Sequence, residues 1–155
     1  MAKFDLELPN DIIKDFEKIY RDSDRIFGEM TRAGAEVVQK NVEVNAPSAI
    51  KGHTKLTKTY KTPSDGGINT KVIVTGYLPF SNPNRTSFTR KGGKGVVYST
   101  AKGVPVNFLA QLYEYGRSNA PFPKHPFLRK SFKKDEIEKA MLEAQKKASG
   151  GLLDE

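Results

Sequence analysis

The sequence has 155 residues, with 26 Lys and Arg against 18 Asp and Glu and no cysteine. The lack of cysteine excludes a disulfide framework, a thiol nucleophile and cysteine-ligated metals, and no window approaches the roughly 20 apolar residues that a membrane span needs. We therefore expect a single domain over residues 1–148, with residues 149–155 as a frayed tail and with no membrane contact.

Charge is distributed unevenly along the chain. Residues 1–50 contain 7 Lys and Arg and 10 Asp and Glu, residues 51–134 contain 16 and 2, and residues 135–155 contain 3 and 6, so the three segments carry −3, +14 and −3. A cationic middle segment indicates an acidic or polyanionic partner. The alternative is that these lysines are solvated loop residues that serve solubility.

The first helix is predicted from Asn10 to about Val42, because apolar residues recur there at spacings of three, four or seven. This apolar stripe comprises Ile12, Phe16, Ile19, Ile26, Met30, Ala33 and Val37. In a small domain, a stripe of this length must be covered by more than one element. The outer, solvated face of the helix is expected to carry Arg21, Asp22, Asp24 and Arg25. Ala46-Pro47 should end the helix, since a residue before proline is biased out of the helical region.

A β-hairpin is predicted after this helix. Residues 51–62 alternate and are rich in threonine, residues 70–77 form the clearest strand of the chain, and residues 63–67 between them read Pro-Ser-Asp-Gly-Gly, a strong turn signal. Residues 96–99 are expected to form a third strand, antiparallel to the second.

A long mobile loop is predicted over residues 79–95, which consist mainly of turn formers and cations. This loop and the hairpin turn supply the candidate interaction residues, which are Phe80, Arg85, Phe88, Arg90, Lys91, Lys94 and Asp65. Residues 91–95 lack the spacing of a phosphate-binding loop and the helix that follows one, so no cofactor is expected here.

The stretch from Val104 to Phe132 is expected to organise the rest of the chain. A short helix should begin near Pro105 and close at Gly116 with positive φ, and three prolines predict an ordered, non-helical strap over residues 117–125. The last helix is then predicted from about Pro126 to Ala148. Its apolar face comprises Leu128, Phe132, Ile137, Met141, Ala144 and Ala148.

The residues that anchor this stretch are predicted to be Tyr113, Glu114, Tyr115, Gly116, Pro126, Phe127, Leu128, Arg129 and Phe132. Phe127 and Leu128 should enter the core where the strap joins the last helix. The predicted fold class is α+β, with the long N-terminal helix and the C-terminal helix packed on a small antiparallel sheet that carries the long loop.

Few residues suggest catalysis. His53 and His125 lie in separate turns without carboxylates at metal-ligand spacing, so we expect structural or exposed roles for both. Glu114 could act as a buried general base, but pairing with Arg117 or Arg129 is the favoured interpretation. We therefore expect no catalytic, metal or cofactor site, and a protein that is not an enzyme.

The order of motifs around Glu114 resembles a known family. Tyr113-Glu114-Tyr115-Gly116, a proline-rich strap and then Pro126-Phe127-Leu128-Arg129 with Phe132 are similar to the tail-component family of long-tailed bacteriophages, the tail-completion or neck proteins of the head–tail junction. Ala46-Pro47 after the first long helix is a weaker second match. Lys130-Ser131 stands where the family usually has Pro-Ala, and the connection from Pro47 to Leu56 is longer than usual.

The resemblance implies a structural virion protein, assembled in the host bacterial cytoplasm, that forms a hexameric ring between tail and head. Its implied partners are further copies of itself and the phage proteins on the connector and tail-tube sides, with phage DNA transiently close. The loop 79–95 and the turn 63–67 would then be contact arms. The alternative is a small basic nucleic-acid-binding protein that uses the loop 79–95, with cations on phosphates and aromatic side chains on bases.

Overall fold

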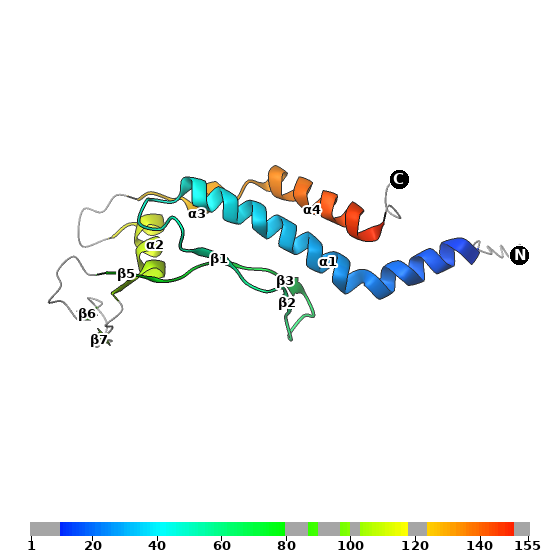
Figure 1. Cartoon of the computed structure of the whole chain (residues 1–155), viewed down its shortest axis with the longest axis horizontal. Coiled ribbons are helices and arrows are strands. Elements are labelled where there is room, and N and C mark those ends of the chain that lie inside the picture. Colours follow the sequence, from blue (N-terminus) through cyan, green and yellow to red (C-terminus); the bar gives the residue numbers. More distant parts are fainter. Residues whose placement is uncertain (1–9, 80–86, 90–96, 100–102, 118–123, 151–155) are drawn as a thin grey trace, which may run out of the picture.

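One 36-residue helix, α1 (Asn10–Asn45), forms the long axis of the structure (Figure 1), a computed structural model that describes residues 10–79, 87–89, 97–99, 103–117 and 124–150. At 1.5 Å per residue α1 is about 54 Å long. It ends where predicted, because Ala46 still donates its N–H to the Val42 carbonyl (2.8 Å) and Pro47 follows.

Three further helices follow in the C-terminal half of the chain: α2 (Val106–Tyr115), α3 (Leu128–Ser131) and α4 (Lys134–Ser149). The short helix α2 is confirmed. It follows Pro105 and closes at Gly116, whose φ of 76° and ψ of −171° lie in a region that is essentially restricted to glycine. Helix α4 runs back along α1 in the opposite direction (Figure 1).

The last helix had been predicted to be continuous, but in the structure it is broken at Phe132. This residue has φ −86° and ψ 78°, and the Lys133 N–H donates to the Ser131 carbonyl (3.1 Å), which is the geometry of an inverse γ-turn. The turn redirects the chain so that α4 can pack along α1. The predicted boundary at the C-terminal end is confirmed, since α4 ends at Ser149 before a left-handed Gly150.

The predicted hairpin is confirmed, and it contains a bulge. Strand β1 (Thr54–Leu56) pairs with β4 (Val72–Val74) and β2 (Tyr60–Lys61) pairs with β3 (Ile68–Asn69), both antiparallel. Residues 57–59 separate β1 from β2, but only residues 70 and 71 separate β3 from β4. The first strand therefore carries one extra residue, as in a β-bulge.

The third strand was predicted with the wrong partner. Strand β7 (Val97–Ser99) pairs with β6 (Ser87–Thr89), a strand inside the predicted loop, and β5 (Tyr77–Leu78) pairs instead with β8 (Val104–Pro105). A strand close in sequence competes well for pairing, because closing a short loop costs little conformational entropy. The remaining residues of the loop 79–95, except Pro79, lie outside the described residues.

The hydrophobic core lies where the C-terminal half of α1 meets α2 and the start of α3. Its buried residues are Val42, Ala46, Ile50, Val106, Ala110 and Phe127. Three of these six belong to the stretch from Val104 to Phe132, in agreement with its predicted organising role. A long N-terminal helix, a C-terminal helix and small antiparallel sheets make the fold α+β.

Candidate assembly surface

The predicted interaction residues fall mostly outside the described part of the chain. Phe80, Arg85, Arg90, Lys91 and Lys94 lie there, and the described backbone of Phe88 pairs with Tyr98 across β6 and β7. Asp65 is exposed at the tip of the hairpin, where its Oδ1 accepts the Gly67 N–H (2.9 Å). Its role there is that of an Asx-turn residue.

The predicted anchor is built around the Glu114 carboxylate. Glu114 is 3% exposed, and its two oxygens accept the backbone N–H groups of Phe127 (2.9 Å), Leu128 (2.9 Å) and Arg129 (3.4 Å). The first N–H groups of a helix have no intrahelical acceptor, so a carboxylate at the start of α3 satisfies them and complements the helix dipole. Glu114 thereby fixes the end of α2 to the start of α3.

Arg129, one of the two predicted ion-pair partners of Glu114, completes this anchor. Its Nε lies 3.2 Å from Glu114 Oε1, and its guanidinium carbon lies 5.2 Å from the centre of the Tyr115 ring. The backbone of Tyr113 accepts the His125 N–H (2.7 Å), which holds the end of the strap against α2. Residues 118–123 of the strap lie outside the described residues.

Two of the anchor residues that were predicted to lie on the apolar face of the last helix do not enter the core. Phe127 is buried as predicted, but Leu128 is 36% exposed and Phe132 is 68% exposed. The predicted single apolar face does not exist even on a continuous helix, because at 3.6 residues per turn Leu128 and Phe132 would lie roughly 180° and 140° around the axis from the buried Ile137. Pro126 lies before α3 in non-helical conformation and is partly buried.

Ser131 fixes this break, and the sequence analysis gave it no role. Its buried hydroxyl lies 2.5 Å from the Phe127 carbonyl oxygen and 3.1 Å from that of Asn41, and it accepts a hydrogen bond from Asn45 Nδ2 (3.1 Å). The only signal in the sequence was that Ser stands at a position where alanine is usual in the proteins that the motif resembles.

The N-terminal third of α1 is not covered by any described element. Figure 1 shows it extending past the end of α4 and past the β2–β3 hairpin. We call its exposed apolar residues the α1 strip; they are Ile12, Ile13, Phe16 and Tyr20, with exposed fractions of 42, 42, 64 and 84%. Within the described residues, the prediction that other elements of this domain cover the apolar stripe is therefore wrong for Ile12 and Phe16.

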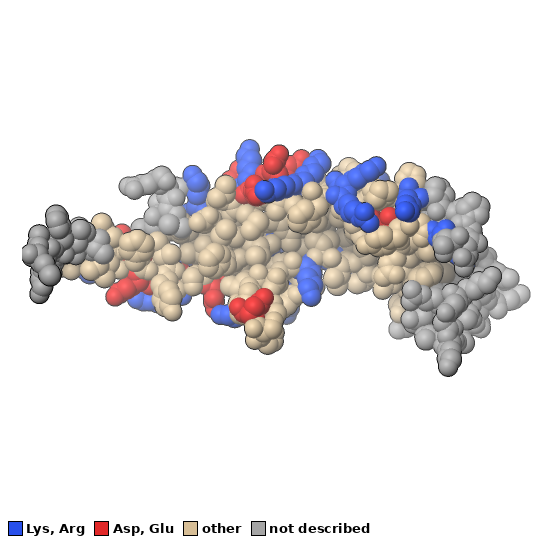
Figure 2. All heavy atoms as spheres, turned by 180° about the vertical axis from the view of Figure 1, so that it is seen from behind, with Lys and Arg blue, Asp and Glu red and all other residues tan. Residues whose placement is uncertain are grey.

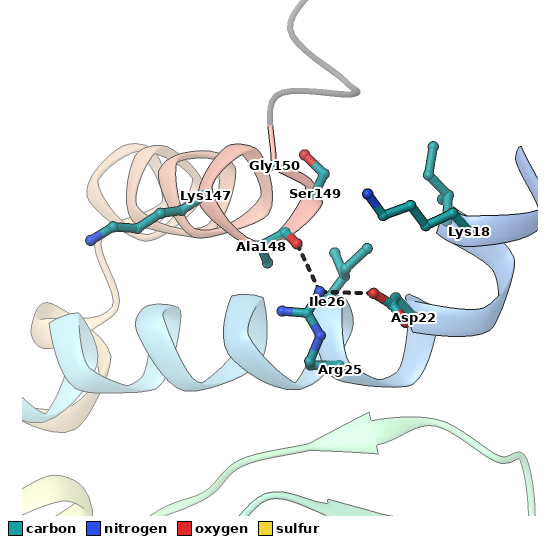
Figure 3. Close-up of a pocket in the computed structure, with 9 residues that line it drawn as sticks. Lys18, Asp22, Arg25, Ile26, Lys147, Ala148, Ser149 and Gly150 are labelled. Atoms are coloured by element: carbon teal, nitrogen blue, oxygen red, sulfur yellow. Dashed lines mark hydrogen bonds and ion pairs between the residues drawn. The ribbon is translucent and has the colours of Figure 1, made fainter. Parts of the chain in front are cut away.

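The point where coverage ends is marked by Arg25 (Figure 3). Its Nη2 donates to the Ala148 carbonyl (3.0 Å) in the last turn of α4 and pairs with Asp22 (3.0 Å). Arg25 thus caps a carbonyl that lacks an intrahelical donor, in addition to the surface pairing predicted for it. A small pocket of about 170 Å³ lies beside this contact, and Lys18 extends over it toward the end of α4 (Figure 3).

A second uncovered apolar surface lies on the other half of the molecule. We call it the Phe132 groove: an open groove of about 370 Å³ between α1, the β3–β4 strands and α4. Its apolar lining comprises Gly34, Ala35, Val38, Ile68, Val72, Phe132, Ile137 and Met141. Gly34 brings α1 close to α4, since a Cβ atom there would lie 3.0 Å from the Met141 side chain.

Cationic residues are frequent in the segment that contains Phe132, which borders this groove. Figure 2 shows them over the part of the molecule that contains α3, whereas much of the middle of that face carries no charge. In this segment Lys124, Arg129, Lys130, Lys133 and Lys134 are exposed, and the acids Asp135 and Glu136 follow directly after it. Within the described part of the chain, Lys130 forms no ion pair, while Lys133 and Lys134 pair with Glu136 and Glu138 on α4.

The acidic residues of α1 lie mainly in its N-terminal third. Residues 10–24 carry a net charge of −2, because they contain five acids and three cations: Asp11, Asp15, Glu17, Asp22 and Asp24, with Lys14, Lys18 and Arg21. One chain therefore carries an acidic, apolar helix end and an apolar groove bordered by a segment of net positive charge. Such opposite surfaces suit association with other protein chains.

The described residues contain no cluster of three or more His, Cys, Asp or Glu side chains that could hold a metal ion, and no helix among them is long and apolar enough to cross a membrane. His53 has a structural contact, with Nδ1 3.1 Å from the Thr75 carbonyl oxygen. Comparisons of the chain with protein families, with characterised proteins and with solved structures found no match.

Proposed function

We propose that the chain is a structural subunit of the head–tail junction of a long-tailed bacteriophage, a tail-completion or neck protein that forms a ring joining the tail to the head. In this proposal it catalyses no reaction and uses no cofactor. It is assembled in the bacterial cytoplasm and resides in the virion. Its partners are neighbouring copies of itself, arranged as a hexamer, and the proteins on the connector and tail-tube sides, with phage DNA passing close by.

The α1 strip is the observation that carries the assembly role. Its four large apolar side chains lie on a helix that projects past the elements packed beside it. Contiguous exposed apolar surface with charged residues around it is typical of protein–protein contacts. At 3.6 residues per turn, Phe16 and Tyr20 lie on the same side of α1 as Gly34 and Val38, which line the Phe132 groove further along the helix. Within the described residues this side is left open, so a second protein can pack on the strip.

The anchor supports the phage assignment, because the two motifs shared with the tail-completion family act as one physical unit. Glu114 belongs to the Tyr-Glu-Tyr-Gly motif, and the N–H groups that it binds belong to Phe127, Leu128 and Arg129 of the Pro-Phe-Leu-Arg motif. A pair of short motifs that are separate in sequence and interact in space is better support for the resemblance than either motif alone.

Disruption of the gene in the phage genome that encodes this chain tests the proposal. We expect the lysate to contain DNA-filled heads and complete but separate tails, and expression of the chain from a plasmid should restore joined particles. Electron microscopy of both lysates is the measurement. Joined, infectious particles that lack this chain would overturn the proposal.

Nucleic-acid binding by the isolated protein would replace the proposal with its alternative. The assay is fluorescence anisotropy of labelled random duplex and single-stranded DNA with the full chain. For a structural subunit we expect no sub-micromolar binding at about 0.15 M salt. A nucleic-acid-binding protein that uses several cations would bind under these conditions, with an affinity that falls steeply as salt rises.

A further inference from the structure

The α1 strip needs a partner surface that is apolar, concave and cationic. Ile12, Phe16 and Tyr20 follow one another at spacings of four, so they form a continuous ridge along one side of the helix. Glu17 borders this ridge, whereas Lys14 and Lys18 lie on the opposite side of the helix. The ridge therefore presents apolar surface with a negative edge.

The Phe132 groove has the matching properties. It is open to solvent, it is lined by aliphatic side chains such as Val38, Val72 and Ile137, and Phe132 stands at its border with 68% of its surface exposed. Residues 124–138, which include Phe132 and Ile137 of the groove, carry five cations and the three acids Asp135, Glu136 and Glu138, a net charge of +2. Lys133 and Lys134 pair with two of these acids, whereas Lys130 forms no ion pair within the described residues.

We infer that the α1 strip of one copy of the chain docks in the Phe132 groove of a second copy. This inference deepens the proposed ring assembly and rests on it. The opposite charges of the two surfaces favour this pairing and steer two copies into it. Packing of one α1 strip against another is disfavoured, because it would bring Glu17 and its acidic neighbours on the two copies together.

The two surfaces lie apart on the chain, so they can be used on different neighbours. On α1, Phe16 of the strip and Ala35 of the groove are 19 positions apart, or about 28 Å along the helix at 1.5 Å per residue. In the proposed ring each copy places its strip on one neighbour and receives the strip of another in its groove, whereas a reciprocal two-fold pair would stop at a dimer and give no ladder in the trapping experiment below. Repetition of such a contact gives a ring if the rotation closes and a filament if it does not.

Disulfide trapping tests the contact directly, because the natural chain has no cysteine to give a background. The single variants Phe16→Cys and Phe132→Cys are mixed at high concentration in a thiol–disulfide buffer, with one of them carrying a mass tag. We expect disulfide-linked heterodimers in large excess over homodimers of either variant. A chain that carries both substitutions should form a ladder of larger oligomers.

The controls match the exposure of the tested side chains. Val44→Cys replaces Phe132→Cys, since these residues are 69 and 68% exposed, and Leu142→Cys replaces Phe16→Cys, since these are 55 and 64% exposed. Lys130→Glu in the groove partner should slow trapping several-fold and remove much of its salt dependence. Trapping of the tested pair no faster than that of the control pairs, or faster homodimer formation by Phe16→Cys alone, would overturn the inference.

This experiment and the gene disruption can fail independently. Specific trapping together with normal particles from the disrupted phage would leave the self-docking contact in place and remove the junction role. Unjoined heads and tails without specific trapping would support the junction role, but they would show that proteins other than this chain cover the α1 strip.

Discussion

At the scale of single residues, the Glu114 side chain is the centre of the predicted anchor. Its carboxylate accepts three backbone N–H groups and pairs with Arg129, whose side chain is 69% exposed. We expect Glu114→Gln to lower the free energy of unfolding by about 2 kcal/mol, because a buried amide replaces a charged acceptor and turns an NH₂ group toward donors. Arg129→Ala should cost about 1 kcal/mol or less, since water screens its ion pair. Urea unfolding of both variants is the measurement, and equal losses would contradict the central role of the carboxylate.

Glu43 provides a pH-dependent contribution at the same scale. Its carboxylate accepts hydrogen bonds from the Thr54 hydroxyl and from the Gly52 N–H (2.8 Å), and these bonds, that of Thr54 first, lower the pKa of Glu43 below its usual 4.5. A group with a lowered pKa in the folded state stabilises the fold above its unfolded pKa, and this stabilisation is lost as pH falls through the folded value.

We therefore expect Glu43→Gln to destabilise the protein at neutral pH by an amount that shrinks as pH falls below 4.5. The measurement is the urea midpoint of both proteins from neutral pH to about pH 3. Glu36→Gln is the matched control, because Glu36 lies on the same helix, is exposed, and has Arg32 as its one ion-pair partner among the described residues. A Glu43→Gln deficit that stays constant with pH would contradict this account.

At the scale of elements, the sequence predicted those structures that depend on neighbouring residues. Helix α1, the hairpin around residues 63–67 and helix α2 with Gly116 follow from periodicity and turn chemistry within each segment. The break between α3 and α4 could not be predicted in this way. It depends on the Ser131 hydroxyl, which meets the Asn41 carbonyl 90 residues earlier in the chain.

The pairing of β5 with β8 was also missed, and it depends on a glycine. Gly103 has a φ of 102°, and a Cβ atom there would lie 2.0 Å from the Leu78 carbonyl oxygen, so only glycine permits this approach. We expect Gly103→Ala to cost at least about 2 kcal/mol of unfolding free energy.

Gly52→Ala is the control for Gly103→Ala, since φ is 79° at Gly52 but a Cβ atom meets nothing within 4 Å. This variant should show the strain of positive φ without a steric clash of the Cβ atom, and therefore a smaller loss of unfolding free energy. Thermal unfolding of both variants gives the comparison. Losses of the same size would mean that the close approach between β5 and β8 contributes nothing to stability.

At the scale of the whole molecule, the sequence predicted the anchor better than the assembly surface. The pairing of Glu114 with Arg129 follows from the scarcity of acids in a cationic segment. The exposure of the α1 strip does not follow from its pattern, because an apolar stripe on a helix has the same periodicity whether its own chain or another protein covers it. Only the position of the end of α4 relative to α1 distinguishes the two cases, and this is a tertiary property.

Helix α1 therefore has a part that supports assembly and a part that supports folding, and substitutions should separate them. Phe16→Gln with Tyr20→Gln should leave the free energy of unfolding within about 1 kcal/mol of the natural protein, because both side chains are exposed and Gln is a good helix former. Ile26→Ala, only ten positions beyond Phe16, should cost about 2 kcal/mol or more, because Ile26 is 5% exposed beside the end of α4. Urea unfolding followed by circular dichroism gives both values. A double variant as unstable as Ile26→Ala would mean that the strip packs within its own chain, and no surface would then remain on α1 for a neighbouring copy.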